Sequence, residues 1–254
     1  MIRVFHVISL RLWPIIISFV VLIRFIRLYL SIKVGVNLLI LVSVLIILNW
    51  FKDVRRERDL LVEHRFINNI FFKTGIILFI TSEVMFFVSF FWCYFDFVLV
   101  VDAELGRVWP PKGIQRINPF RIPLLNTLIL LSSGVLITWT HFSLLNNDWF
   151  YRVVTLLFTL ILGIYFLCIQ FQEYVDATYT FIRRGYGRIF FLATGFHGFH
   201  VLLGCALITA SLIRLVMLNC DAIRHYNFEF SAWYWHFVDV VWLFLFIFIY
   251  WWGF

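Results

Sequence analysis

The chain has 254 residues, of which 63% are hydrophobic, 21% are aromatic and only 14% are charged. Soluble domains carry roughly half apolar and about a quarter charged residues, so this composition excludes an ordinary soluble enzyme or binding domain. A formal net charge of +7 is typical of membrane-protein loops beside lipid phosphates, and we do not read it as a nucleic-acid surface.

Seven stretches are apolar enough to cross a bilayer core, which takes about 20 residues per helix. They lie near residues 13–31, 34–51, 69–95, 122–145, 150–173, 187–216 and 231–252. Their apolar runs are continuous, whereas the strands of a membrane barrel alternate polar and apolar residues. The sequence therefore predicts an all-α, polytopic membrane protein with seven transmembrane helices.

Two hydrophilic connections interrupt the apolar runs. The segment from Phe51 to Phe66 interleaves both signs of charge at helical spacing, which predicts a surface helix or turn. The segment from Asp102 to Pro123 holds most of the prolines, which favours an extended loop. We expect a two-helix hairpin at residues 1–51, a charged connection at 52–68 and a five-helix bundle at 69–254.

Glu83 is an ionisable residue near the middle of the third apolar run. Such a group costs about 2.5–3.5 kcal/mol at the centre of a spanning helix on insertion scales, so it needs a partner or a purpose. Two interpretations stay open. The carboxyl exchanges protons or reacts with apolar carboxyl reagents, or it is a neutral acid that forms a hydrogen bond to a neighbouring helix.

Histidines occur on several of the predicted helices. His197 and His200 are three residues apart and share one helical face, a spacing that a metal or haem site uses. His141 and His236 lie on other helices, so a b-type haem carrier remains an alternative. A metal site would need more ligands than this pair, and the sequence predicts no metal site.

The last apolar run carries His236 and Asp239 near its start, again three residues apart. We expect both to face protein rather than lipid, in a polar contact that fixes the last helix against the bundle. The sequence has no P-loop, GxSxG or HExxH motif. A proton-coupled transporter centred on Glu83 is a second alternative, although paired helix breaks at the midplane are missing.

Several long motifs resemble one known family, the cytochrome c oxidase subunit III proteins of mitochondria. They are NWFKDVRRE, LFITSEVMFFVSFFW, ELGRVWPPKGIQRINPF, PLLNTLILLSSGVLITW, ATGFHGFHV and WYWHFVDVVWLFLFIFIYWWGF. These motifs follow one another in the family's order over nearly the whole chain. WTHFSL departs from the usual WAHHSL, so His141 is followed by Phe142 and not by a second histidine.

The resemblance implies seven helices, split two plus five around a V-shaped cleft that holds phospholipid, in the mitochondrial inner membrane. It implies a non-redox core subunit of respiratory complex IV that binds no haem or copper itself. Haem a, haem a3 and copper would lie in partner subunits. The direct partner would be catalytic subunit I, with subunit II and small accessory subunits in the same complex.

The resemblance also carries site residues onto this chain. Glu83, in SEVMFF, matches the family's intramembrane glutamate that reacts with carbodiimide. Trp50, Glu57, His64 and Arg214 match positions that line or approach the lipid cleft. Phospholipid phosphates favour arginine, histidine and tryptophan at the interface, which agrees with these assignments. No residue of this chain is expected to be catalytic.

Overall fold

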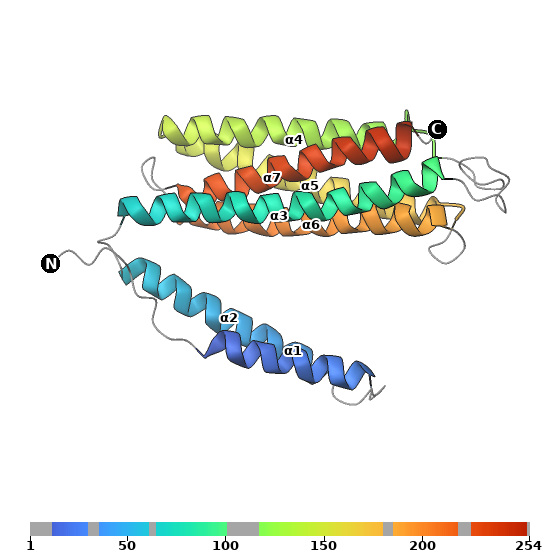
Figure 1. Cartoon of the computed structure of the whole chain (residues 1–254). Helices are drawn as coiled ribbons and strands as arrows, with labels where there is room; N and C mark the ends of the chain where they lie inside the picture. Colours follow the sequence, from blue (N-terminus) through green and yellow to red (C-terminus); the bar gives the residue numbers. More distant parts are fainter. Residues whose placement is uncertain are drawn as a thin grey trace. The chain divides into compact units, whose positions relative to one another are not determined.

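The chain is all-helical in the parts that the structure describes. A computed structural model describes residues 12–29, 36–60, 65–100, 117–179, 185–217 and 225–252, and these ranges contain no strand. The helices are α1 (Trp13–Tyr29), α2 (Val36–Leu60), α3 (Arg65–Leu99), α4 (Ile122–Leu145), α5 (Trp149–Asp176), α6 (Gly185–Val216) and α7 (Tyr226–Leu245), which continues into the π-helix η2 (Phe246–Trp251) (Figure 1). The predicted all-α class is confirmed.

Five helices are long and apolar enough to cross a membrane. They cover Phe71–Leu99, Ile122–Leu145, Trp149–Asp176, Tyr186–Val216 and Tyr226–Trp251. Each closes its own backbone hydrogen bonds, as lipid requires. Of the two helices nearest the amino terminus, α1 has 17 residues and α2 has 25, and the shorter apolar stretch found among the described residues is Leu41–Trp50.

The chain divides into two compact units, Met1–Phe72 and Lys73–Phe254. In the first unit α1 packs against α2. The indole Nε1 of Trp13 donates a hydrogen bond of 2.8 Å to Oδ2 of Asp53, which links the start of α1 to the charged end of α2. The finer boundaries at residues 51 and 69 stay predictions.

The charged connection is largely helical. α2 runs to Leu60, nine residues beyond the end of the predicted apolar window, and α3 begins at Arg65. The surface helix expected here is therefore an extension of α2 rather than a separate element.

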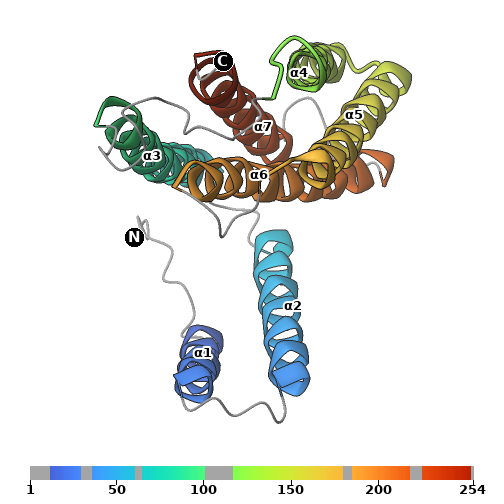
Figure 2. The same ribbon diagram turned by 90° about the vertical axis from the view of Figure 1, so that its right-hand side faces the viewer.

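In the second unit, α4, α5, α6 and α7 each pack against two of the others, in the order α4–α5–α6–α7 and back to α4. Figure 2 shows this arrangement nearly along the helix axes. The α4–α5 turn is short because Asn147 adopts a left-handed conformation with φ of 59°, which asparagine tolerates better than most residues.

Trp235 fills the centre of these four helices and is fully buried. Its Nε1 donates to Oγ of Ser133 on α4 at 2.9 Å. A Cβ atom added at Gly163 of α5 would lie 2.6 Å from Trp235 Cη2, and one at Gly204 of α6 would lie 2.8 Å from Cε3. Two glycines on neighbouring helices therefore provide the space that one indole occupies.

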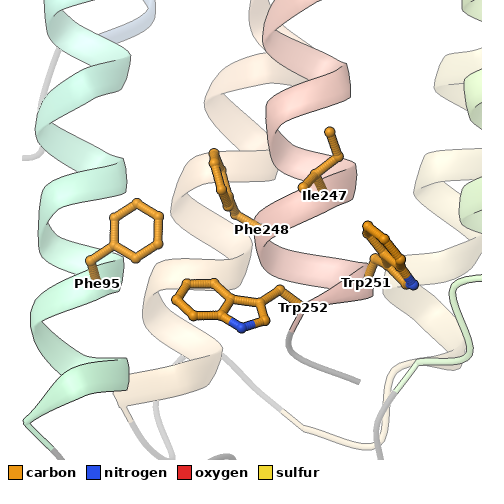
Figure 3. Close-up of a pocket in the computed structure, with 5 residues that line it drawn as sticks. All are labelled: Phe95, Ile247, Phe248, Trp251 and Trp252. Atoms are coloured by element: carbon orange, nitrogen blue, oxygen red, sulfur yellow. The ribbon is translucent and has the colours of Figure 1, made fainter.

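α3 packs on α6 and α7 through aromatic side chains. Its Tyr94 hydroxyl donates to the carbonyl of Phe248 in η2 at 2.7 Å. Figure 3 shows Phe95 of α3 facing Phe248 and Trp252, which line a hollow of about 430 Å³ together with Ile247 and Trp251. Large rings rather than close backbones hold α3 in place.

Candidate functional site

Glu83 on α3 and His200 on α6 form an interhelical pair inside the apolar layer. Oε2 of Glu83 lies 2.9 Å from Nε2 of His200. The histidine side chain is 4% exposed and the glutamate side chain 25% exposed. Glu83 therefore has the partner on a neighbouring helix that one of the two sequence interpretations required, while its proton exchange stays a prediction.

The second ring nitrogen of His200 fixes the proton count of this pair. Nδ1 lies 2.8 Å from the carbonyl oxygen of Phe196, and because a carbonyl only accepts, Nδ1 carries a hydrogen. Nε2 of a neutral ring is then an acceptor, and Glu83 must donate as the neutral acid. The alternative is an imidazolium facing a carboxylate, so one proton lies between Nε2 and Oε2 in either case.

Aromatic rings surround this proton. The His200 ring centroid lies 5.1 Å from that of Phe87, 6.0 Å from that of Phe237 and 6.3 Å from that of Tyr234. Low polarity strengthens a hydrogen bond that is fully made and penalises an unpaired polar group. The carboxyl and imidazole of this pair therefore satisfy each other within an aromatic surrounding.

An apolar groove runs between α3 and α7 beside this pair. It has a volume of about 520 Å³, and it is lined by Ile80, Val84, Phe87, Val88, Phe91, His236, Phe237, Val240, Val241, Phe244 and Phe248. His236 is the one ionisable residue in this lining.

His197 does not share the environment of His200, although the two lie on one face of α6. Its ring is buried, with centroids 5.3 Å from Trp242 and 5.7 Å from Phe166. The two histidines therefore have different neighbours: His197 packs against Trp242 and Phe166, and His200 faces Glu83. His200 has both ring nitrogens engaged, which leaves neither free as a haem ligand.

His236 and Asp239 lie together on α7. Nδ1 of His236 is 3.8 Å from Oδ2 of Asp239, with the histidine side chain 42% exposed and the aspartate 9%. A Cβ atom at Gly134 of α4 would lie 2.7 Å from the same Oδ2. Asp239 thus abuts α4 where that helix has no side chain, and its role in fixing α7 stays a prediction.

The four residues predicted at the lipid cleft are placed unequally. Trp50 is half-buried on α2, and Arg214 is half-buried in the last turn of α6. Glu57 lies in α2, where only its backbone is described, and His64 lies outside the described residues. Trp50 and Arg214 belong to different units, so the cleft assignment stays a prediction.

A second group of ionisable residues was missed by the reasoning from sequence. His141 of α4 and His225 and Glu229 at the start of α7 place ligand-type atoms within 4.8 Å of one another. The spacing of His225 and Glu229 by four residues was a usable signal, because such residues are neighbours on a helix. The pairing with His141 depends on packing, and no local pattern shows it.

Comparison with known proteins gives a consistent result. The family model described as cytochrome c oxidase subunit III matches residues 3–254. The chain is 47% identical over 213 residues to cytochrome c oxidase subunit 3 of Aedes aegypti, covering 84% of this chain and 81% of the relative. The Drosophila melanogaster protein of that name is 48% identical with the same coverage, and the Paracentrotus lividus protein is 47% identical over 214 residues, covering 84% of this chain and 82% of the relative.

Proposed function

Because the chain belongs to the cytochrome c oxidase subunit III family, we propose that it acts as the third core subunit of that respiratory complex, complex IV. The complex transfers electrons from cytochrome c to oxygen and pumps protons. This chain is its non-redox membrane subunit, which stabilises the catalytic subunit and supports proton uptake and oxygen access. The observation that carries the proposal is the family match over residues 3–254.

The redox centres belong to the partners in this proposal. Haem a, haem a3 and copper lie in the partner subunits, and this chain packs directly on catalytic subunit I. Subunit II and small accessory subunits complete the complex. The engagement of both ring nitrogens of His200 supports a structural role for this histidine. The family match does not favour the alternatives, a b-type haem carrier or a proton-coupled transporter.

The membrane setting follows from the same premise. The chain is a multi-pass protein, and we place it in the mitochondrial inner membrane, with α1 and α2 crossing as a pair. Phospholipid is the bound lipid in this proposal, and Trp50, Glu57, His64 and Arg214 are its binding residues. The division of the chain at Phe72 supports a two-plus-five arrangement.

The pair formed by Glu83 and His200 is the functional carboxyl site in this proposal. One proton between Oε2 and Nε2 at 2.9 Å, in an aromatic surrounding, tunes proton delivery without taking part in oxygen reduction. The partial exposure of Glu83 supports its reaction with an apolar carbodiimide, because such a reagent must reach the carboxyl from the lipid side.

A fractionation experiment tests the assignment. The complex that contains this chain is purified in mild detergent, the chain is stripped off, and visible spectra and metal content are recorded for both fractions. We expect haem and copper to stay with the large partners and the stripped chain to be colourless. Haem that follows this chain would overturn the non-redox assignment, and single glutamine variants of His141, His197, His200 and His236 would then identify its ligands.

A further inference from the structure

His141, His225 and Glu229 meet at one end of the bundle. His141 lies four residues before the end of α4, and His225 is the residue that precedes α7. Glu229 follows one turn later, and its backbone N–H donates to the carbonyl of His225 at 3.0 Å. Helix geometry therefore fixes two of the three side chains on one face, and the α4–α7 packing brings the third.

The distances suit a small cation. Nε2 of His225 lies 3.5 Å from Oε1 of Glu229, and all three ligand atoms lie within 4.8 Å of one another. In a tetrahedral zinc site with bonds of about 2.0–2.1 Å, ligand atoms are separated by about 3.3 Å. The pair on α7 already has this spacing, and the His141 ring centroid lies 5.5 Å from that of His225.

Lys73 of α3 orients the carboxylate. Its ammonium lies 3.2 Å from Oε2 of Glu229 and near the ring faces of Tyr226 and Trp233. Lys73 pairs with Oε2 of Glu229, while Oε1 of the same carboxylate lies near His225. A carboxylate that is held by a second group is the usual arrangement behind a metal ligand.

We propose that His141, His225 and Glu229 form a binding site for a divalent transition metal ion, with Zn²⁺ as the preferred ion. Two imidazoles and one carboxylate are a ligand set that zinc accepts, with water in the fourth position. The site lies where the apolar span Tyr226–Trp251 begins, and its three residues are half-buried. All three ligands belong to this chain, so metal binding does not depend on its role in an oxidase.

X-ray absorption spectroscopy at the cobalt K-edge tests the site without a mutation that could disturb the fold. The full-length chain is purified from membranes with the subunits that accompany it, and one equivalent of Co²⁺ is added. The cobalt K-edge is separate from those of iron, copper and zinc. We expect the scattering pattern of two imidazoles around the added ion. A cobalt shell without imidazole would overturn the site.

Binding measurements on variants give the second test, with Zn²⁺ itself as the probe in equilibrium dialysis. We expect the double variant H141Q/H225Q and the single, shape-conserving variant E229Q each to bind the first equivalent of Zn²⁺ at least about tenfold more weakly than wild type. The control is D176N, which removes an exposed carboxylate at the end of α5 and should leave that affinity unchanged. Equal affinity in wild type and both ligand variants, or an equal loss in D176N, would overturn the proposal.

Discussion

Nε2 of His200 lies 2.9 Å from Oε2 of Glu83, although 117 residues separate them in the chain. The ring cannot turn freely to avoid this contact, because Nδ1 is bound to the carbonyl of Phe196 one turn earlier. The glutamate at membrane depth is thus compensated by a histidine whose orientation is set by its own helix. The pair explains how α3, which packs mainly through aromatic rings, tolerates a carboxyl in its apolar stretch.

The first prediction concerns Glu83→Gln. The side-chain amide donates to Nε2 of a neutral His200, so the contact between α3 and α6 survives while the exchangeable proton is lost. We expect normal assembly, an initial oxygen-reduction rate within about twofold of wild type, and loss of carbodiimide labelling. Initial rates and labelling stoichiometry of the purified complex are the measurements.

Glu83→Leu is the matched control for the contact itself. It leaves Nε2 of His200 without a donor, and an unsatisfied buried acceptor costs about 1–3 kcal/mol. We therefore expect earlier heat-induced loss of this subunit than in Glu83→Gln. Complete loss of oxygen reduction in a normally assembled Glu83→Gln complex would show that the carboxyl does more than tune proton delivery.

The second prediction concerns Asp239→Leu. The leucine places two methyl groups where Oδ2 now lies close to Gly134, and it removes the carboxyl that faces His236 at 3.8 Å. We expect a lower yield of assembled complex and an unchanged haem spectrum in the fraction that survives. Asp239→Asn keeps the shape and should assemble better. An altered haem spectrum at normal yield would contradict a purely structural role.

The third prediction concerns the space around Trp235. Gly163→Ala puts a methyl group 2.6 Å from Cη2 of the indole, and overpacking of this kind costs about 1–3 kcal/mol. We expect a lower unfolding midpoint in mixed detergent. Gly198→Ala is the control, because a Cβ there meets nothing within 4 Å. Equal midpoints for the two variants would mean that the indole moves aside without cost.

The sequence predicts the helices far better than their contacts. Hydropathy alone located the five long spans, because a helix in lipid must be apolar over its whole length. For α4 the predicted window, 122–145, is also the observed extent of the helix. Charge spacing indicated the helical character of the first connection. It did not show that α2 continues to Leu60, because hydropathy reports where lipid ends and not where the helix does.

Residue pairs across helices could be inferred only where an energetic need was visible. Glu83 signalled that it required a partner, and candidates were available, but the choice of His200 over His197 depends on the rotation of α6 about its axis. Similarly, His225 and Glu229 carry a local signal, whereas His141 joins them only through packing of α4 on α7. Such rotations are set by the fit of many side chains, for example Trp235 against Gly163 and Gly204.

The fourth prediction concerns the hydrogen bond from Trp242 on α7 to Thr127 on α4. Nε1 of the indole donates to Oγ1 at 3.0 Å, while the threonine hydroxyl itself donates to the carbonyl of Pro123 at 2.9 Å. Interhelical hydrogen bonds in membranes contribute about 0.6 kcal/mol on average and about 1.7 kcal/mol at most. We expect a coupling energy in this range from a double-mutant cycle of Trp242→Phe and Thr127→Val.

The cycle is measured as unfolding free energies in mixed detergent. Thr127→Val keeps the β-branched shape, and Trp242→Phe keeps an aromatic ring against His197 and Phe166, so the coupling term isolates the hydrogen bond. Trp139→Phe serves as the control, because that indole is half exposed on the outer face of α4 and its loss should not couple to Thr127. Additive effects of Trp242→Phe and Thr127→Val would show that shape alone, without this hydrogen bond, holds α7 against α4.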